Sequence, residues 1–197
     1  MYMFLLWNFV EGFFVKSIAS FDDTLTHIPV ISYLTKTKQG RVAFSIGTFL
    51  ALTVILIIAI FFSTFLSKIY YAHQIAASLI LVLALLIYFD VFLVKSTNRL
   101  ASRFSKLNSS QNYLRLIKAG FLVSFITLID DAFVLIPLFL HDNLSRLLSI
   151  VGVYLAATLQ ILIVIYFGGR LEKVKYKKEL AAVSLLILSI LVYTGVI

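Results

Sequence analysis

Long apolar stretches alternate with short polar segments along the whole chain. The apolar stretches cover residues 4–15, 42–66, 75–94, 121–140, 147–167 and 180–197. A helix needs roughly 20 apolar residues to cross the hydrocarbon core of a bilayer, and most of these stretches reach that length. The first does so only if its helix continues through an acidic segment near residue 22. Because transmembrane barrels have short alternating segments instead, the pattern predicts an all-α integral membrane protein with six transmembrane helices.

The composition agrees with this interpretation. Apolar residues make up 61% and charged residues 13% of the 197 positions, whereas a soluble domain carries about 25% charged residues. The polar side chains are too few to cover a water-soluble domain of this size. The chain has no cysteine, which excludes disulfides, thiolate metal sites and thiol redox chemistry. The N-terminus has no basic region before its apolar stretch, so we expect a first span rather than a removable signal peptide.

The net charge of +8 suggests a nucleic-acid partner, but its distribution indicates membrane topology instead. Of the 17 basic residues, 14 lie in three loops or at the helix starts beside them. Loops rich in Lys and Arg stay cytoplasmic, and the two loops between them contain only Lys68 and Arg146. This alternation predicts a multi-pass cell-membrane protein with both termini extracytoplasmic, in contact with the lipid bilayer and not with nucleic acid. The clustered residues are Lys36, Lys38, Arg41, Lys95, Arg99, Arg103, Lys106, Arg115, Lys118, Arg170, Lys173, Lys175, Lys177 and Lys178.

The two halves of the chain match each other. At an offset of 108 residues, Gly12, Asp22, Asp23, Ile28 and Pro29 match Gly120, Asp130, Asp131, Ile136 and Pro137. At an offset of 105, Arg41, Gly47, Leu50, Ala51 and Thr53 match Arg146, Gly152, Leu155, Ala156 and Thr158. Each half holds three expected helices, and three is odd, so the second half enters the membrane inverted, as in many secondary transporters. We therefore expect two inverted three-helix repeats at 1–94 and 115–197, joined by a basic cytoplasmic linker at 95–114.

The four aspartates of this repeat are the main candidate site. A charged residue at the centre of a membrane helix costs about 2.5–3.5 kcal/mol, so Asp22, Asp23, Asp130 and Asp131 predict a function. Inverted helices bring their acidic pairs together at the centre, and carboxylates bind hard divalent cations such as manganese. Pro29 and Pro137 lie two turns after the acidic pairs and free a carbonyl one turn earlier, so we expect them to break these helices.

Other polar residues are candidates for lining the site. Ser20 precedes the first acidic pair, and His27 lies one turn after Asp23, although its repeat counterpart is Leu135. Ser124 and Thr127 offer hydroxyl oxygens, or bond carbonyls of their own helix. Gln160 is either a ligand or a contact between helices.

The basic residue Lys16 lies in the first expected helix. It either pairs with an acid such as Asp23 or extends its ammonium group to the membrane surface. Pairing would support a proton-relay interpretation. We expect no buried basic partner for Asp130 and Asp131 within the second half. Because a structural ion pair would need such a partner, this weighs against a merely structural role for the aspartates.

These motifs resemble a known group of membrane proteins. Six spans in two halves, with Ser20-Phe21-Asp22-Asp23 and Pro29 in one and Ile129-Asp130-Asp131 and Pro137 in the other, resemble the lysine-exporter (LysE) superfamily. The likeness is greatest to its metal-ion exporters, of the TerC, cadmium-resistance (CadD) and manganese/calcium types. Those families often have Asp-Asn or Gly-Asp where this chain has Asp-Asp. The resemblance implies export of divalent metal ions.

The predicted function is therefore export of divalent cations, with the ion as substrate and with no resident cofactor. Manganese is favoured over softer ions because no Cys is present and the only Met residues, Met1 and Met3, lie far from the aspartates. Protons are the candidate coupling ion. The alternative is an exporter of basic amino acids or other cationic metabolites. An intramembrane aspartyl enzyme fits the repeated Asp-Asp pattern least well, so no enzymatic activity is expected.

Overall fold

The computed structural model describes residues 2–20, 38–89, 113–140, 142–171 and 177–195. They form α1 (Tyr2–Ala19), α3 (Lys38–Leu66), α4 (Ala72–Tyr88), α6 (Tyr113–Thr127), α7 (Asp131–Leu135), the 3-10 helix η1 (Pro137–Phe139), α8 (Asn143–Leu171) and α9 (Lys177–Tyr193). Within these ranges there is no strand. The all-helical class is therefore confirmed for the part of the chain that the structure describes.

Two of these helices are long and apolar enough to cross a membrane. The spans are Gln39–Leu66 within α3 and Asn143–Ile163 within α8. Only 33% and 28% of their most apolar windows are buried inside the protein, whereas the core helix of a soluble protein is mostly buried. The apolar helices Ala72–Leu86 and Ala182–Tyr193 are shorter. These features are consistent with a membrane protein, and the number of six spans stays a prediction.

The expected helix over 121–140 is not one helix. The last hydrogen bond continuing α6 runs from the Leu128 N–H to the Ser124 carbonyl, at 2.8 Å. The chain then turns, and α7 begins at Asp131. A second interruption follows at Pro137, which opens η1 because its ring nitrogen has no hydrogen to donate. An interruption was expected at Pro137, but not the earlier one between Thr127 and Asp131, of which the apolar run gives no sign.

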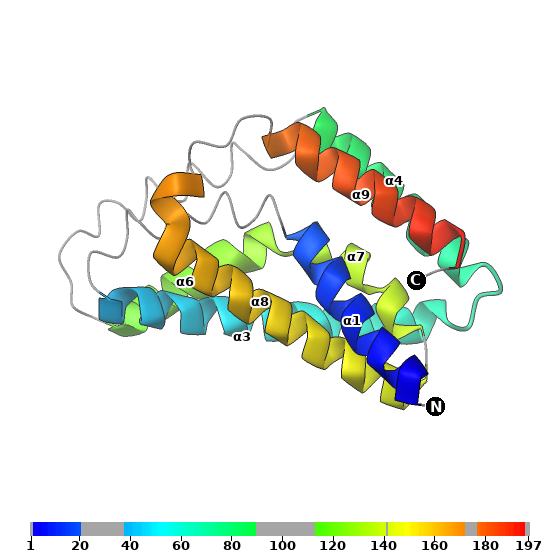
Figure 1. Ribbon diagram of the computed structural model, residues 1–197, viewed down its shortest axis with the longest axis horizontal. Coiled ribbons are helices and arrows are strands. Elements are labelled where there is room, and N and C mark those ends of the chain that lie inside the picture. Colours follow the sequence, from blue (N-terminus) through cyan, green and yellow to red (C-terminus); the bar gives the residue numbers. More distant parts are fainter. Residues whose placement is uncertain (1, 21–37, 90–112, 141, 172–176, 196–197) are drawn as a thin grey trace.

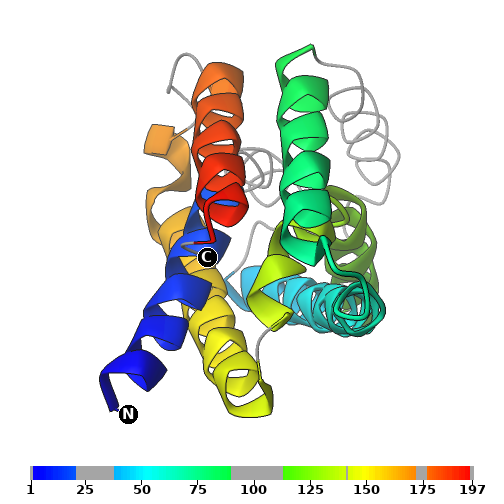
Figure 2. The same cartoon turned by 90° about the vertical axis from the view of Figure 1, so that its right-hand side faces the viewer.

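In the part of the chain that the structure describes, the six longer helices pack as three pairs. α1 lies against α8, α3 against α6, and α4 against α9. In Figure 1 the α1–α8 pair and the α3–α6 pair cross the molecule in opposite directions, while the two members of each pair run roughly the same way. α4 and α9 lie side by side and antiparallel on one flank, as the turned view in Figure 2 also shows.

Glycines hold the first two pairs at backbone contact. A Cβ atom at Gly12 of α1 would lie 2.3 Å from the carbonyl oxygen of Ser149 in α8. A Cβ atom at Gly120 of α6 would lie 2.2 Å from the carbonyl oxygen of Phe44 in α3. Gly12 and Gly120 are related by the offset of 108, and Phe44 and Ser149 by that of 105. The two crossings are thus made at equivalent positions of the two halves.

The facing glycines repeat the same relation. A Cβ atom at Gly152 would meet the carbonyl oxygen of Phe9, and one at Gly47 would meet that of Ile117, each at 2.2 Å. Gly47 and Gly152 are related by 105, and Phe9 and Ile117 by 108. All four glycines are needed because any side chain would separate backbones that touch.

The ends of the helices gather at two ends of the molecule. α3 and α6 start together at one end (left in Figure 1), where the Tyr113 hydroxyl donates to Oε1 of Gln39 at 2.5 Å. α8 ends on that same side. The N-terminus, the turn from α3 to α4 and the end of α9 lie toward the other end. α1 and α6 both finish about half-way between the two.

Candidate functional site

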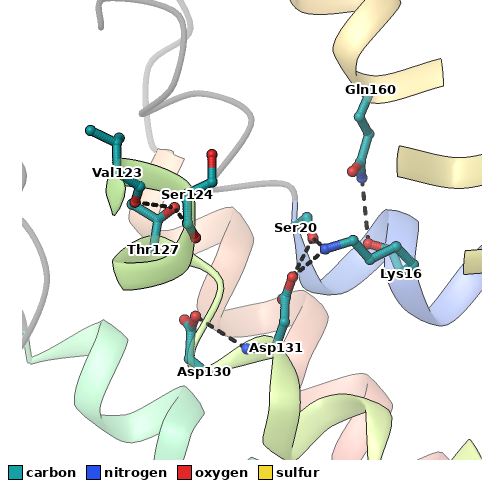
Figure 3. Close-up of polar contacts among 8 residues, drawn as sticks. All are labelled: Lys16, Ser20, Val123, Ser124, Thr127, Asp130, Asp131 and Gln160. Atoms are coloured by element: carbon teal, nitrogen blue, oxygen red, sulfur yellow. Dashed lines mark hydrogen bonds and ion pairs between the residues drawn. The ribbon is translucent and has the colours of Figure 1, made fainter. Parts of the chain in front are cut away.

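The candidate site lies where α1 and α6 end. α1 stops at Ala19, and the Ser20 N–H still bonds the Lys16 carbonyl at 3.1 Å. α6 stops at Thr127, and after three intervening residues the chain resumes as α7 at Asp131. Figure 3 shows the end of α1 facing the start of α7. A discontinuous helix in the middle of an apolar bundle is how many transporters place polar groups and backbone carbonyls at a substrate site.

Asp130 shapes the break in the helix. Its carboxylate Oδ1 accepts the N–H of Asp131 at 3.1 Å and so caps the N-terminus of α7. The Phe133 N–H returns to the Asp130 carbonyl at 3.0 Å. A short polar side chain is favoured at a helix N-cap because it satisfies a backbone donor that the helix cannot. Asp130 therefore both interrupts the α6–α7 segment and contributes a buried carboxylate beside the break.

The second aspartate forms an ion pair with the other half of the chain. The ammonium group of Lys16 in α1 donates to Oδ2 of Asp131, and also to Oγ of Ser20. The Ser20 hydroxyl in turn donates to the same Oδ2, at 2.7 Å. The side chains of Lys16 and Asp131 are each 2% exposed, so this is a buried ion pair. Two donors from the first half of the sequence thus meet at one carboxylate oxygen of the second half (Figure 3).

The second acidic pair has a buried basic partner, and this partner comes from the first half of the chain. Lys16 was expected either to pair with an acid, such as Asp23, or to reach the membrane surface, and it pairs with Asp131, 115 residues away. The reason is the packing of α1 beside α7. The repeat counterpart of Lys16 is Ser124, so the second half supplies no equivalent ammonium group.

The two carboxylates of the pair point in different directions. Asp131 points toward α1, whereas Asp130 points toward its own backbone turn and the end of α6 (Figure 3). Both are buried, at 2% and 9% relative exposure. The ammonium group of Lys16 therefore lies on the Asp131 side of the pair.

The hydroxyl residues of α6 have different partners. Thr127 donates to carbonyls of its own helix, those of Val123 and Ser124, both at 3.2 Å. The Ser124 hydroxyl bonds the Thr48 hydroxyl of α3 at 2.8 Å and so ties the two helices together. Thr127 satisfies carbonyls at the end of α6, next to the break.

Gln160 of α8 contacts α1 rather than either aspartate. Its Nε2 donates to the backbone carbonyl of Lys16 at 3.4 Å. This is the arrangement expected of a helix-to-helix contact. It supports the turn of α1 that carries Lys16.

Several candidates fall outside the described residues: Asp22, Asp23, His27 and Pro29. Among the residues that the structure does describe, no group of three His, Asp or Glu side chains is close enough to hold a metal ion. Pro137 is buried, and it sits one helical segment beyond the acidic pair.

Two polar residues of α1 were not singled out as site candidates in the sequence. Asn8 donates from Nδ2 to the Ser145 hydroxyl at 3.0 Å, and its carbonyl accepts from the Ser149 hydroxyl at 3.1 Å. Glu11 is 6% exposed, and its Oε1 has no hydrogen-bond partner within the described ranges. With Lys16 and Ser20 they form a polar row along the buried side of α1. Their spacing of three to five residues in an otherwise apolar helix could have indicated that they share one side of it.

Comparisons with protein-family models, with characterised proteins and with solved structures found no match to this chain.

Proposed function

We propose that the chain is a multi-pass membrane transporter that exports divalent metal cations, with manganese favoured, through a central acidic site. The observation that carries the proposal is the meeting of a helix end and a helix break about half-way along the molecule. One is the end of α1 with Lys16 and Ser20, and the other is the break before α7 with Asp130 and Asp131. A bundle of apolar helices gains nothing in stability from burying such charges, so a role in transport is the better explanation.

The pairing of the helices supports an inverted repeat. The contacts of α1 with α8 and of α6 with α3 use counterpart glycines, and the two pairs run in opposite directions. α4 and α9, the third elements of the two halves, are antiparallel. This is the relation expected of repeats that share a two-fold axis in the membrane plane, and substrate sites lie at such repeat interfaces.

The distribution of charge supports the topology. The basic residues Lys38, Arg41, Arg115 and Lys118 lie near the starts of α3 and α6, on the side of the molecule where α8 ends with Arg170 nearby in its last turn. Both termini belong to the other side. By the positive-inside rule the basic side is cytoplasmic and the termini are extracytoplasmic.

The contacts of Lys16 favour a metal ion over the alternative substrate, a basic amino acid. An amino acid carries a carboxylate and needs a basic group in the site. Lys16 is the only Lys or Arg between Met1 and Ala19 of the first span, and its ammonium group is engaged by Asp131 and Ser20. Oxygen ligands without sulfur suit hard divalent cations. The resemblance of the motifs to metal-ion exporters of the LysE superfamily agrees with this substrate class.

The proposal is tested by transport in proteoliposomes. We expect Asp130→Asn and Asp131→Asn each to lower Mn²⁺ flux at least about tenfold, and Asp22→Asn and Asp23→Asn to do the same, because each removes a charge from the cation path. Asp142→Asn, at an exposed position before α8, is the matched control and keeps normal flux. Normal Mn²⁺ flux in all four site variants, at equal protein content, contradicts the proposal.

A further inference from the structure

The contacts of Lys16 have a consequence for how a cation binds. Its ammonium group occupies the position that a bound cation would take against Asp131, with the carboxylate Oδ2 and the Ser20 hydroxyl as its oxygen partners. Carboxylate and hydroxyl oxygens are also ligands for hard metal ions. We propose that Asp131 and Ser20 form a cation site that the protein's own Lys16 fills in this conformation, and that Lys16 and the transported cation exclude each other from it.

Exclusion follows from charge and burial. Asp131 and Lys16 are each 2% exposed, so solvent does little to screen a second positive charge placed beside them. A cation that reaches Asp131 therefore has to displace the ammonium group. Conversely, Asp131 left without any cation would be a buried uncompensated charge, which is strongly unfavourable. The site is therefore stable when one of the two cations is present, either the ammonium group of Lys16 or the incoming ion.

Occupancy by Lys16 also changes the charge of the site. When Lys16 withdraws, the site loses one positive charge, which favours the binding of an incoming cation beside Asp131. The identity of the competing ion in this inference rests on the proposed function. The binding of an ammonium group by Asp131 and Ser20 does not depend on the proposed function.

The first test measures Mn²⁺ binding to the purified full-length chain by the loss of the free-ion electron paramagnetic resonance signal. Lys16→Met keeps the length of the side chain and removes the competing charge. We expect Mn²⁺ to bind this variant about tenfold more tightly or better, within the range of coupling between mutually exclusive ligands. Lys118→Met, at an exposed position of α6, is the matched control and binds Mn²⁺ like the wild type. Equal or weaker binding by Lys16→Met overturns the proposal.

The second test involves neither metal nor transport. Lys16→Ala leaves room for a free alkylammonium ion. We expect propylammonium, at a tenfold excess over its dissociation constant, to raise the Tm of Lys16→Ala by about 3–6 °C. The same salt should leave the Tm of Lys16→Ala/Asp131→Asn unchanged. Tetramethylammonium, which has no N–H to donate, should have no effect on either variant.

The outcomes separate the two proposals. Rescue by propylammonium without Mn²⁺ binding by any variant supports the ammonium site and contradicts metal export. Mn²⁺ flux that needs the aspartates, combined with no propylammonium effect on Lys16→Ala and an unchanged Mn²⁺ affinity of Lys16→Met, supports metal export and overturns the present inference. If Lys16→Ala does not fold, the Mn²⁺ affinity of Lys16→Met decides alone.

Discussion

At the scale of single residues, the identity of the acidic candidates could be predicted and their partners could not. Carboxylates in an apolar helix stand out in any sequence, and so does Lys16. Helical spacing suggested Asp23 as the partner of Lys16, and Asp23 lies outside the described residues. The observed partner, Asp131, is set by packing between distant segments, which spacing along one helix does not encode.

Asp142 gives a residue-scale prediction about pH. Its carboxylate accepts the Ser145 hydroxyl at 2.6 Å and the N–H groups of Leu144 and Ser145 at 3.2 and 3.4 Å, and so caps α8. The hydrogen bond from the Ser145 hydroxyl, followed by that from its N–H, holds the pKa of Asp142 below the ordinary value of 3.8. Because the folded-state pKa is lowered, this carboxylate stabilises the protein above pH 3.8, and the contribution is lost as the pH falls through the folded-state pKa.

We therefore expect Asp142→Ala to lower the Tm at pH 7, and the difference from the wild type to shrink as the pH falls from 5 to 3. Thermal unfolding of both proteins in detergent across this range measures it. Asp142→Asn retains a capping oxygen without a titrating group, so its difference from Asp142→Ala should not depend on pH. A deficit of Asp142→Ala that is the same at pH 3 as at pH 7 would show that the charge of Asp142 does not matter.

At the scale of the elements, helix type was predictable and helix continuity was not. Runs of Leu, Ile, Val and Phe are long enough to specify α3 and α8, each of 29 residues. The run over 121–140 looks equally continuous, yet the chain leaves the helix after Thr127 and again before Pro137. Pro137 predicts the second interruption. The first depends on Asp130 capping α7. An Asp within an apolar run is compatible both with a helix cap and with a position inside a helix.

At the glycine crossings we expect a change from glycine to alanine to destabilise the protein, which is the opposite of its usual effect in a helix. Replacing a helical glycine by alanine ordinarily stabilises a helix by about 1 kcal/mol. At Gly12 and Gly120 a methyl group would lie within 2.3 Å of a backbone oxygen of the opposing helix, and a backbone cannot rotate away. We expect Gly12→Ala and Gly120→Ala to lower the Tm, and by similar amounts because the two crossings are equivalent.

Thermal unfolding of the purified variants checks this expectation. Ser78→Ala on the exposed side of α4 changes a small residue away from any crossing and serves as the control. A raised Tm for either glycine variant would mean that the helices do not approach so closely. A loss at only one of the two would argue against equivalent crossings.

At the scale of the whole molecule, the two halves were visible in the sequence, but the manner of their packing was not. The offsets of 108 and 105 relate positions along the chain, and nothing in them says that the first helix of each half packs against the second helix of the other. That exchange depends on complementary surfaces around the glycines. It brings α1 and α7 together and thereby forms the Lys16–Asp131 contact.

The orientation in the membrane can be tested with single cysteines, because the natural chain has none. Tyr70, 90% exposed in the turn from α3 to α4, belongs to the end that we place outside. Arg115, at the exposed start of α6, belongs to the basic end. We expect a membrane-impermeant maleimide to label Tyr70→Cys in intact cells and Arg115→Cys only after permeabilisation. The reverse pattern would invert the topology, and labelling of both from outside would place both helix ends on one side of the membrane.

The backbone contacts at the glycine crossings limit which parts of the protein can move. Two helices whose backbones touch have no side-chain layer in which to slide, so α1 with α8, and α3 with α6, should each behave as a rigid body. Any change of access must then occur between these bodies. Lys16 belongs to one of them, and Asp131 belongs to α7, which follows α6 and packs against α3 as well as α1. Relative motion of the two bodies would lengthen or break the Lys16–Asp131 ion pair. The contact that fills the cation site therefore also restrains the opening of the protein, and its loss would accompany that opening.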